Sequence, residues 1–266
     1  MNILDKIIAQ KYIEVEQHKA IISIETLTKQ VSFSRKTLSL KQNLTQANYP
    51  GVIAEFKRHS PSKGDINKNA DIQQIVSGYS QAGASAISVL TDEQFFGGSS
   101  ADLQAARLAT TTTPLLRKDF VIDEYQLFEA RAWGADLVLL IAAALSPERV
   151  LALAKRAKEL DLEVLLEVHS AEEINCINPF VDFVGVNNRN LKTFEVGLQI
   201  SEQLAQLIPN EFIKISESGI DKPENVAHLW NFGYKGFLIG ENFMKTTKPS
   251  DSCNEFISQI RRLTNT

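Results

Sequence analysis

The feature that most constrains the fold is an alternation of short apolar segments with amphipathic segments, which repeats eight times after Pro50 and Gly51. Nearly continuous apolar strands that alternate with helices are typical of a parallel sheet buried on both faces. Eight such units favour closure into a (β/α)8 TIM barrel over an open, doubly wound sheet. The candidate strands are VIAEFKR (52–58), AISVLT (86–91), PLLRKDF (114–120), DLVLLIAA (136–143), EVLLEVH (163–169), FVGVNNR (183–189), FIKISES (212–218) and GFLIGE (236–241).

Helix-start signals lie between these strands. Several are good N-cap residues, and two are followed by a proline that suits the first helical turn. Gly83 and Gly134 stand just before the next strand, where helix C-caps fall. The chain, residues 1–266, has the length that a single barrel domain fills. Helices are expected to start at Asp71, Ser100, Asp123, Ser146, Ser170, Gly197, Asp221 and about Ser250.

Residues 1–50 differ from the rest and predict an N-terminal helical extension. A second helix-prone stretch runs from about Ser23 to Leu40. The apolar face of the first stretch is too regular for a solvated tail, so we expect the extension to cover the barrel near its substrate. Removing about the first forty residues should then leave a folded barrel with a raised KM. The apolar residues near helical spacing are Ile3, Leu4, Ile7, Ile8, Ile13 and Val15.

Charge and composition narrow the class of partner. The net charge of −4 and the pI of about 5.7 provide no field that would gather nucleic acid or an anionic membrane. The N-terminus lacks the pattern of a signal peptide, and no apolar run is long enough to cross a bilayer. We therefore expect a cytoplasmic protein, monomeric, that binds a small molecule.

The cysteines and histidines give no sign of a metal centre. Cys176 and Cys253 lack CxxC spacing, and no two histidines form a ligand pair four residues apart. No glycine-rich nucleotide loop is present either. Neither a metal site nor a disulfide framework is expected.

Polar side chains interrupt the candidate strands near their C-terminal ends, where barrel enzymes place their chemistry. Residues two apart in a strand share a face, so Glu55 and Lys57 should both point to the barrel axis. A single charged residue at a strand end is more often a solvated rim residue than a catalyst, but several in phase are candidates for acid–base work. The other members of this set are Lys118, Glu167, Asn187 and Arg189.

Other charged residues nearby have a more ordinary expected role. Arg58, Arg117 and Asp119 fall on the opposite face or beyond it, and we expect them to form outward salt bridges. His59 and His169 lie at loop positions, where a hydrogen-bonded histidine is expected. The loop from Arg58 to Asn69 joins the first strand to a helix over the mouth, so we expect it to close on substrate.

Two glycine turns follow the last two strands. They contain Gly219, in SESGI, and Gly240, in IGEN. Phosphate sites of many barrels lie at these positions, because main-chain N–H groups and a short helix N-terminus meet there. We expect phosphate to bind between Gly219 and Gly240.

The sequence resembles indole-3-glycerol phosphate synthases. The signature blocks of that family occur in order from about Val52 to Met244, and each block overlaps a different predicted strand. The resemblance implies ring closure of 1-(2-carboxyphenylamino)-1-deoxyribulose 5-phosphate to indole-3-glycerol phosphate, with loss of carbon dioxide and water and with no cofactor. The blocks are IAEFKRHSPSKGDI, LTDEQFFGGS, LLRKDFVID, LLEVHS, VGVNNRNL, ISESGI and FLIGENFM.

The resemblance also implies roles for individual residues. Lys118 would be the general acid of ring closure, and Glu167 the base or acid of dehydration. Lys57 would hold a carboxylate or phosphate of the substrate. Glu241 follows Gly240 where some members have serine, so only its main-chain N–H is assigned to phosphate. Orienting roles fall to Glu55, Asn187, Arg189 and Glu217, and the pocket lining to Ser60, Ser218, Gly219 and Gly240.

Two alternatives remain open from the residues. A phosphoribosylanthranilate isomerase would share the phosphate loops but needs a cysteine and an aspartate as acid–base pair, and neither Cys176 nor Cys253 lies at a strand end. A catalytically silent phosphate-binding module would not need Lys118, Glu167 and Lys57 together. Turnover of the carboxyphenylamino-deoxyribulose phosphate distinguishes the three.

Overall fold

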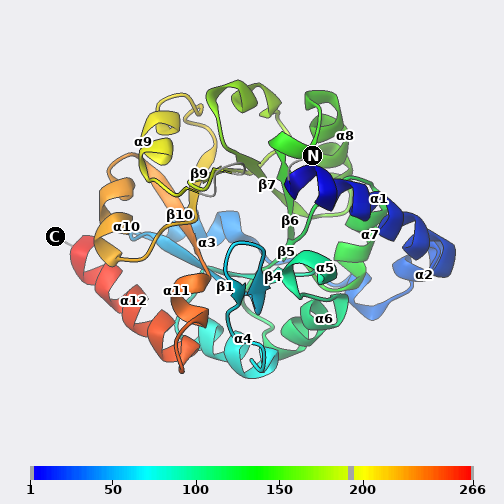
Figure 1. The fold of residues 1–266 in the computed structure, drawn as a ribbon, viewed down its shortest axis with the longest axis horizontal. Coiled ribbons are helices and arrows are strands. Elements are labelled where there is room, and N and C mark those ends of the chain that lie inside the picture. The colour runs from blue at the N-terminus through cyan, green and yellow to red at the C-terminus, as the bar shows by residue number, and fades with distance from the viewer. Residues whose placement is uncertain (1–2, 191–194, 265–266) are drawn as a thin grey trace.

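Eight parallel strands form a closed barrel in the computed structural model of the protein, which describes residues 3–190 and 195–264 (Figure 1). Neighbouring strands follow the chain order, and the last strand pairs with the first, Gly51 beside Gly236. The expected (β/α)8 barrel is confirmed. The strands are β1 (Gly51–Phe56), β4 (Ala86–Leu90), β5 (Leu115–Lys118), β6 (Leu137–Ile141), β7 (Glu163–Val168), β8 (Phe183–Asn187), β9 (Ile213–Glu217) and β10 (Tyr234–Ile239).

Helices surround the barrel, and each begins within two residues of its expected start, although several of the expected residues, such as Ser100 and Gly197, are not the N-cap. The Asp71 side chain accepts a hydrogen bond from Gln74 N at the start of α4, and Ser146 does the same for Arg149 N in α8. After β7 the ring is completed by a 3-10 helix, η3 (Ala171–Cys176). The α-helices of the ring are α4 (Ile72–Gln81), α6 (Ser100–Ala109), α7 (Tyr125–Ala132), α8 (Pro147–Glu159), α9 (Gln199–Ala205), α10 (Pro223–Trp230) and α12 (Pro249–Thr264).

Alternation along β1 separates two apolar layers. Val52, Ala54 and Phe56 belong to the layer between strands and helices, whereas Ile53 belongs to the barrel interior. Glu55 therefore also points inward, as the spacing predicted. Leu116 lies in the interior layer, which places Lys118 on the inner face of β5.

The helical extension differs from the prediction between Ser23 and Leu40. Only α2 (Ile24–Thr28) and a 3-10 turn, η1 (Val31–Ser34), form there, and Arg35 has extended backbone. The predicted helix-prone stretch is therefore only partly helical, and tertiary contacts override helix propensity in the rest of it. Arg35 Nη2 lies 2.7 Å from Asp136 Oδ1, and this ion pair holds the extended segment against the N-terminal end of the barrel.

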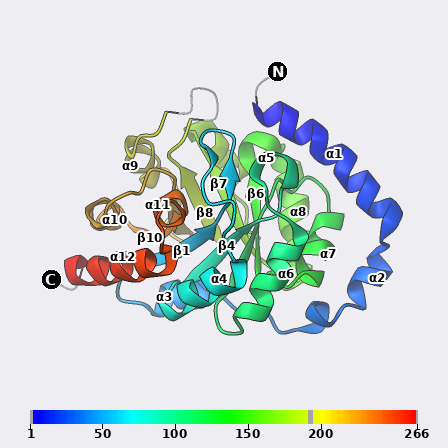
Figure 2. The ribbon, with the colours of Figure 1, turned by 60° about the horizontal axis from the view of Figure 1, so that its bottom comes forward.

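A third helix, α3 (Leu40–Gln46), closes the N-terminal end of the barrel. Leu40 and Leu44 are buried in the interior layer, and the Glu163 carboxylate at the start of β7 accepts hydrogen bonds from Ser39 Oγ and Leu40 N. Replacing Leu44 with alanine should lower the free energy of unfolding by roughly 2–5 kcal/mol, because the substitution would leave a cavity beneath the strands. Figure 2 shows α3 at the end of the barrel opposite the β2–β3 hairpin, β2 (His59–Ser60) and β3 (Gly64–Asp65).

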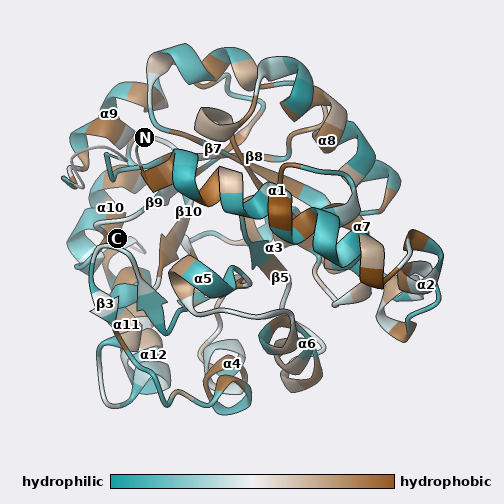
Figure 3. Ribbon diagram, turned by 45° about the vertical axis from the view of Figure 1, so that its right-hand side comes forward, coloured by the Kyte–Doolittle hydropathy of each residue, from teal (hydrophilic) through white to brown (hydrophobic). Residues whose placement is uncertain are grey.

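The first helix, α1 (Ile3–Ile21), crosses the C-terminal side of the barrel next to the short helix α5 (Glu93–Phe96) (Figure 3). Its buried residues are Ile7, Lys11 and Val15, each four apart. Ile13, expected on the apolar face, is 54% exposed, so that assignment was wrong. Buried residues that recur every four positions lie on one face of the helix, and position 13 falls outside that face. In the described part of the chain, every helix is too short or too polar to cross a lipid bilayer.

Candidate active site

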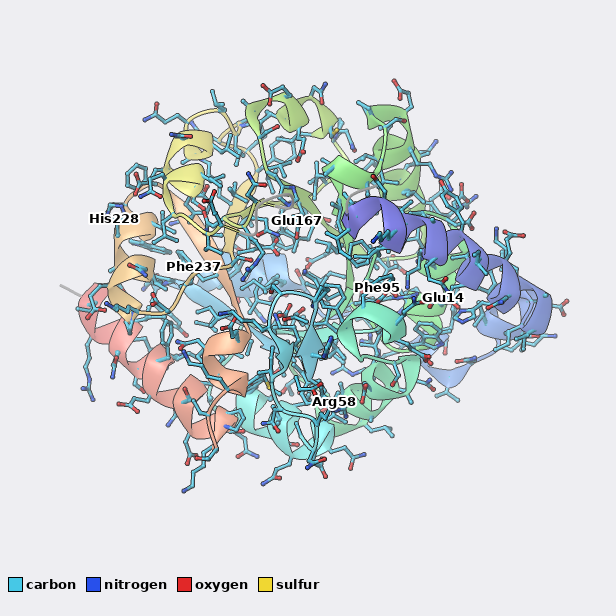
Figure 4. The ribbon with its side chains drawn as sticks, in the orientation of Figure 1. Glu14, Arg58, Phe95, Glu167, His228 and Phe237 are labelled. Carbon is cyan, nitrogen blue, oxygen red and sulfur yellow. The ribbon has the colours of Figure 1, made fainter. Side chains whose placement is uncertain are left out.

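Two adjoining cavities open at the C-terminal ends of the strands, and every residue predicted for the site lines at least one of them. Figure 4 labels Glu167 within the ring of strands. The first cavity is lined by Glu55, Lys57, Ser60, Lys118, Glu167, Asn187, Arg189, Glu217 and Ser218 among others, and the second by Gly219 and Gly240 together with Lys57, Arg189 and Ser218. The roles of these residues stay predictions.

Part of the lining of the first cavity is apolar. Phe96 and Phe120 face each other with ring centroids 6.0 Å apart and planes tilted by 38°. Sequence reasoning assigned no role to either ring. The available signal was the placement of both rings in the segments that follow strands, in QFFGG and KDF. These two rings form an aromatic wall that suits a flat aromatic group, and Ile3, Leu4, Ile7, Ile141 and Leu238 add further apolar lining to the cavity.

Glu55 and Lys57 form an ion pair at the centre of the mouth, with Lys57 Nζ 2.6 Å from Glu55 Oε1. Burial raises the pKa of Glu55, but the charges of Lys57 and Lys118 outweigh it and hold the pKa below its ordinary value. A Cβ atom at Gly240 would lie 2.6 Å from Glu55 Oε1. Gly240 therefore gives the carboxylate its space as well as forming the turn.

Lys118 and Glu167 face each other across the barrel interior, with Lys118 Nζ 3.9 Å from Glu167 Oε2. Burial works against both charges. For Lys118 the carboxylates of Glu167, Glu55 and Glu217 outweigh burial, so the pKa is raised above its ordinary value. For Glu167 burial is outweighed by the charges of Lys118 and His169, so the pKa is lowered. A charged ammonium and an ionised carboxylate therefore stand close together in the site.

His169 lies behind Glu167, away from the cavity. Its Nε2 is 3.2 Å from Glu167 Oε1, and its Nδ1 is 3.3 Å from Glu173 Oε2. The same Glu173 oxygen accepts a hydrogen bond from the main-chain N–H of His169. Burial lowers the pKa of His169, but the two carboxylates outweigh it and raise the pKa to about 10. The loop histidine is hydrogen-bonded as expected, and it also fixes the carboxylate of Glu167.

Glu217 is the third buried carboxylate of the site. Burial and the neighbouring charge of Glu167 raise its pKa well above the ordinary value, so it can carry a proton near neutral pH. A Cβ atom at Gly185 would lie 2.3 Å from Glu217 Oε1, so glycine on the adjacent strand leaves room for the acid.

The two turns of the predicted phosphate site line the second cavity. Ser218 and Gly219 both have left-handed backbone, with φ of 66° and 73°. A Cβ atom at Gly219 would also lie 2.3 Å from Val196 Cγ1. Two lysines, Lys63 and Lys245, line the same cavity, and Lys63 Nζ lies 3.5 Å from Glu241 Oε1. The cavity offers cationic groups and turn backbone to an anion.

The charged residues expected on the outside are confirmed there. Arg117 lies 2.9 Å from Asp119 and 3.1 Å from Glu129, and Arg58 lies 2.7 Å from Asp102. These pairs hold helices and loops to the outer face of the strands.

Neither cysteine lines the two cavities. Cys176 ends η3, and Cys253 is buried in α12. Within residues 3–190 and 195–264, histidine, cysteine and acidic side chains form no group of three placed to hold a metal ion.

Comparisons with known proteins agree with this geometry. The family model of indole-3-glycerol phosphate synthase matches residues 4–256. A relative of that name from Bacteroides thetaiotaomicron is 50% identical over 260 residues, which covers 98% of this chain and 99% of the relative. Another from Bacillus mycoides is 46% identical over 254 residues, covering 94% and 96%.

Solved structures resemble the chain in fold. KGPDC from Streptococcus mutans aligns with a TM-score of 0.62 at 14% identity, over 81% of this chain and 99% of that one. Tryptophan synthase subunit alpha from Legionella pneumophila aligns with a TM-score of 0.59 at 15% identity, over 85% and 97%. These identities are low, so the likeness concerns the barrel.

Proposed function

Because the chain belongs to the indole-3-glycerol phosphate synthase family of tryptophan-biosynthetic carboxy-lyases, we propose that its two cavities hold one substrate end to end. The substrate is 1-(2-carboxyphenylamino)-1-deoxyribulose 5-phosphate. Its aromatic ring would lie between Phe96 and Phe120, and its phosphate near Gly219 and Gly240. The observation that carries the proposal is the closeness of Lys118 and Glu167, 3.9 Å apart, in the cavity that also contains the two aromatic rings.

Ring closure would depend on Lys118. The ring carbon that bears the carboxylate attacks the ketone carbon, and the ketone oxygen takes a proton from the Lys118 ammonium. A buried cation at this oxygen stabilises its developing negative charge. The carboxylate then leaves as carbon dioxide, and its bonding electrons restore the aromatic ring. Lys57 would hold that carboxylate until it leaves.

Dehydration would depend on Glu167. The carbon–oxygen bond of the new hydroxyl breaks, the neighbouring methylene carbon loses a proton to Glu167 to form the indole double bond, and that proton then converts the departing hydroxide to water. The lowered pKa of Glu167 keeps it ionised, as a base for that proton must be. Protonated Glu217, Asn187 and Arg189 would orient the hydroxyls of the chain, and Ser60 and Ser218 would line its path.

We propose that the enzyme is monomeric, because one chain carries every residue that the resemblance assigns to the site. We place it in the cytoplasm, where its buried free thiols, Cys176 and Cys253, stay reduced.

The test is turnover of the carboxyphenylamino-deoxyribulose phosphate by purified protein, followed by indole fluorescence. We expect one indole product and one carbon dioxide per substrate. Turnover of phosphoribosylanthranilate instead would favour the isomerase alternative. Binding of inorganic phosphate without any turnover would favour a silent phosphate-binding module.

A further inference from the structure

The amine of Lys11 is buried beneath α1, where its side chain is only 2% exposed. Three carboxylates surround it: Glu14 Oε2 at 2.8 Å, Asp92 Oδ2 at 3.0 Å and Asp119 Oδ1 at 3.0 Å. Burial lowers the pKa of Lys11, but Asp119, Asp92 and Glu14 outweigh it and raise the pKa above its ordinary value. The ammonium therefore stays charged in a place where a lone charge would be unstable.

Each of the two aspartates that bind Lys11 supports the segment that carries one ring of the aromatic wall. Asp92 is the N-cap of α5, and its Oδ1 accepts a hydrogen bond from Phe95 N, next to Phe96 of the aromatic wall. Asp119 stands between Lys118 and Phe120 in the chain. In Figure 4, the labels of Glu14 on α1 and Phe95 on α5 mark the region where the two helices meet.

Asp119 is itself held in a fixed position. Its Oδ2 accepts hydrogen bonds from Thr91 Oγ1 at 2.6 Å and Arg117 Nη2 at 2.9 Å, and its Oδ1 accepts one from Phe120 N at 2.8 Å. Lys11 thus joins the covering helix to a rigid part of the barrel. Four residues before Lys11, on the same face of α1, Ile7 lines the cavity.

We propose that Lys11 is a positioning residue for the reaction: its buried ammonium binds Asp92 and Asp119 and so holds α1 closed over the aromatic end of the pocket. The inference rests on the proposed function, because it assigns that end to the aromatic ring. Lys11 touches no atom of the substrate. Its effect passes through Ile3, Leu4 and Ile7 on one side and through Phe96 and Phe120 on the other.

The test compares Lys11→Met with Lys19→Met. Lys19 lies on the same helix but forms only partly exposed pairs with Glu16 and Asp123, so it controls for loss of one positive charge from α1. Three quantities are measured in each variant and in the unchanged protein: kcat and KM for the substrate, the inhibition constant of inorganic phosphate, and hydrogen exchange of residues 3–21.

For Lys11→Met we expect faster exchange in α1, a KM raised roughly tenfold or more, and an unchanged inhibition constant for phosphate, which binds at the other end. A misplacement of about 1 Å can reduce a rate about a hundredfold, so kcat should also fall. Lys19→Met should resemble the unchanged protein. Equal behaviour of both variants, or an equal rise of KM and the phosphate constant, would overturn the proposal.

A second variant covers the case in which Lys11→Met does not fold. Lys11→Met with Asp92→Asn removes one positive and one negative charge together, and asparagine is an equally good N-cap for α5. It should fold and show the same raised KM. Exchange in α1 needs no turnover, so it tests the role of Lys11 even if the unchanged protein fails to process the proposed substrate.

Discussion

Lys118 Nζ lies 3.9 Å from Glu167 Oε2, although the two side chains project from strands separated by β6. At this separation the ammonium and the carboxylate are too far apart to hydrogen-bond to each other. Both can therefore still interact with a reacting oxygen placed near them. The pair therefore gives the sharpest test of the proposed chemistry.

Replacing Lys118 with methionine should reduce kcat by on the order of a hundredfold to ten-thousandfold and leave KM nearly unchanged, because the interaction forms only as the ketone oxygen becomes negative. Glu167→Gln should lower kcat similarly, and a ring-closed product that has not lost water should accumulate. Rapid-quench analysis of single turnovers would detect it. A rise in KM alone would make both residues substrate clamps.

His169→Gln should shift the pH dependence of kcat/KM. The imidazolium holds the pKa of Glu167 down, so its removal should raise that pKa and move the acid limb to higher pH, by on the order of one unit. His228→Gln is the control, because His228 forms an exposed pair with Glu202, 2.8 Å apart, on the outer helices. Identical acid limbs in both variants would contradict this role.

The same substitution also tests stability. The pKa of His169 is about 10 in the folded protein, above the ordinary value of about 6.5. Its contribution to stability is therefore complete below about pH 6.5 and is lost as pH rises through about 10. The free energy of unfolding of the unchanged protein should approach that of His169→Gln across this interval. Urea denaturation at several pH values measures it.

Gly219→Val should weaken phosphate binding. The residue has left-handed backbone, and the new side chain would collide with Val196, so the turn must move away from the phosphate. We expect KM and the inhibition constant of inorganic phosphate to rise together, by roughly tenfold or more. Gly233→Val imposes left-handed strain, with φ of 88°, before β10 and without lining either cavity. An equal loss of affinity there would assign the effect to instability.

Deleting residues 1–22 should leave a folded barrel with a raised KM. This deletion is shorter than the one of about forty residues expected from the sequence. Ser39 and Leu40 bind Glu163 and begin the helix that closes the barrel, so they must be kept. A longer deletion should therefore unfold the chain. Circular dichroism would show whether each deletion variant is folded, and substrate titration would measure its KM. Unchanged kinetics in the shorter deletion would mean that α1 is merely structural.

The strands and the inward-facing charges could be predicted because both depend on local spacing. Glu55 and Lys57 share a face wherever a strand forms, and the eightfold alternation supplies the strands. The outward role of Arg117 followed from the same rule.

Features that depend on distant partners could not be predicted. From the sequence alone, Lys11 looks like an ordinary polar residue of a helix. Only the folded structure shows that Asp92 and Asp119 bind its amine. Likewise Arg35 ends a helix-prone stretch because Asp136, far along the chain, binds it. The hairpin inside the loop from Arg58 to Asn69 was also missed, since strands of two residues carry no periodicity. Closure of that loop on substrate stays a prediction.

Two acids of the site each occupy space that a glycine on or just after a neighbouring strand leaves free: Glu55 beside Gly240 and Glu217 beside Gly185. Each glycine and its acid should therefore be inherited as a unit. A descendant that gained even a methyl group at position 185 or 240 would have to move or lose the carboxylate. Covariation of these two pairs across related sequences would record that dependence.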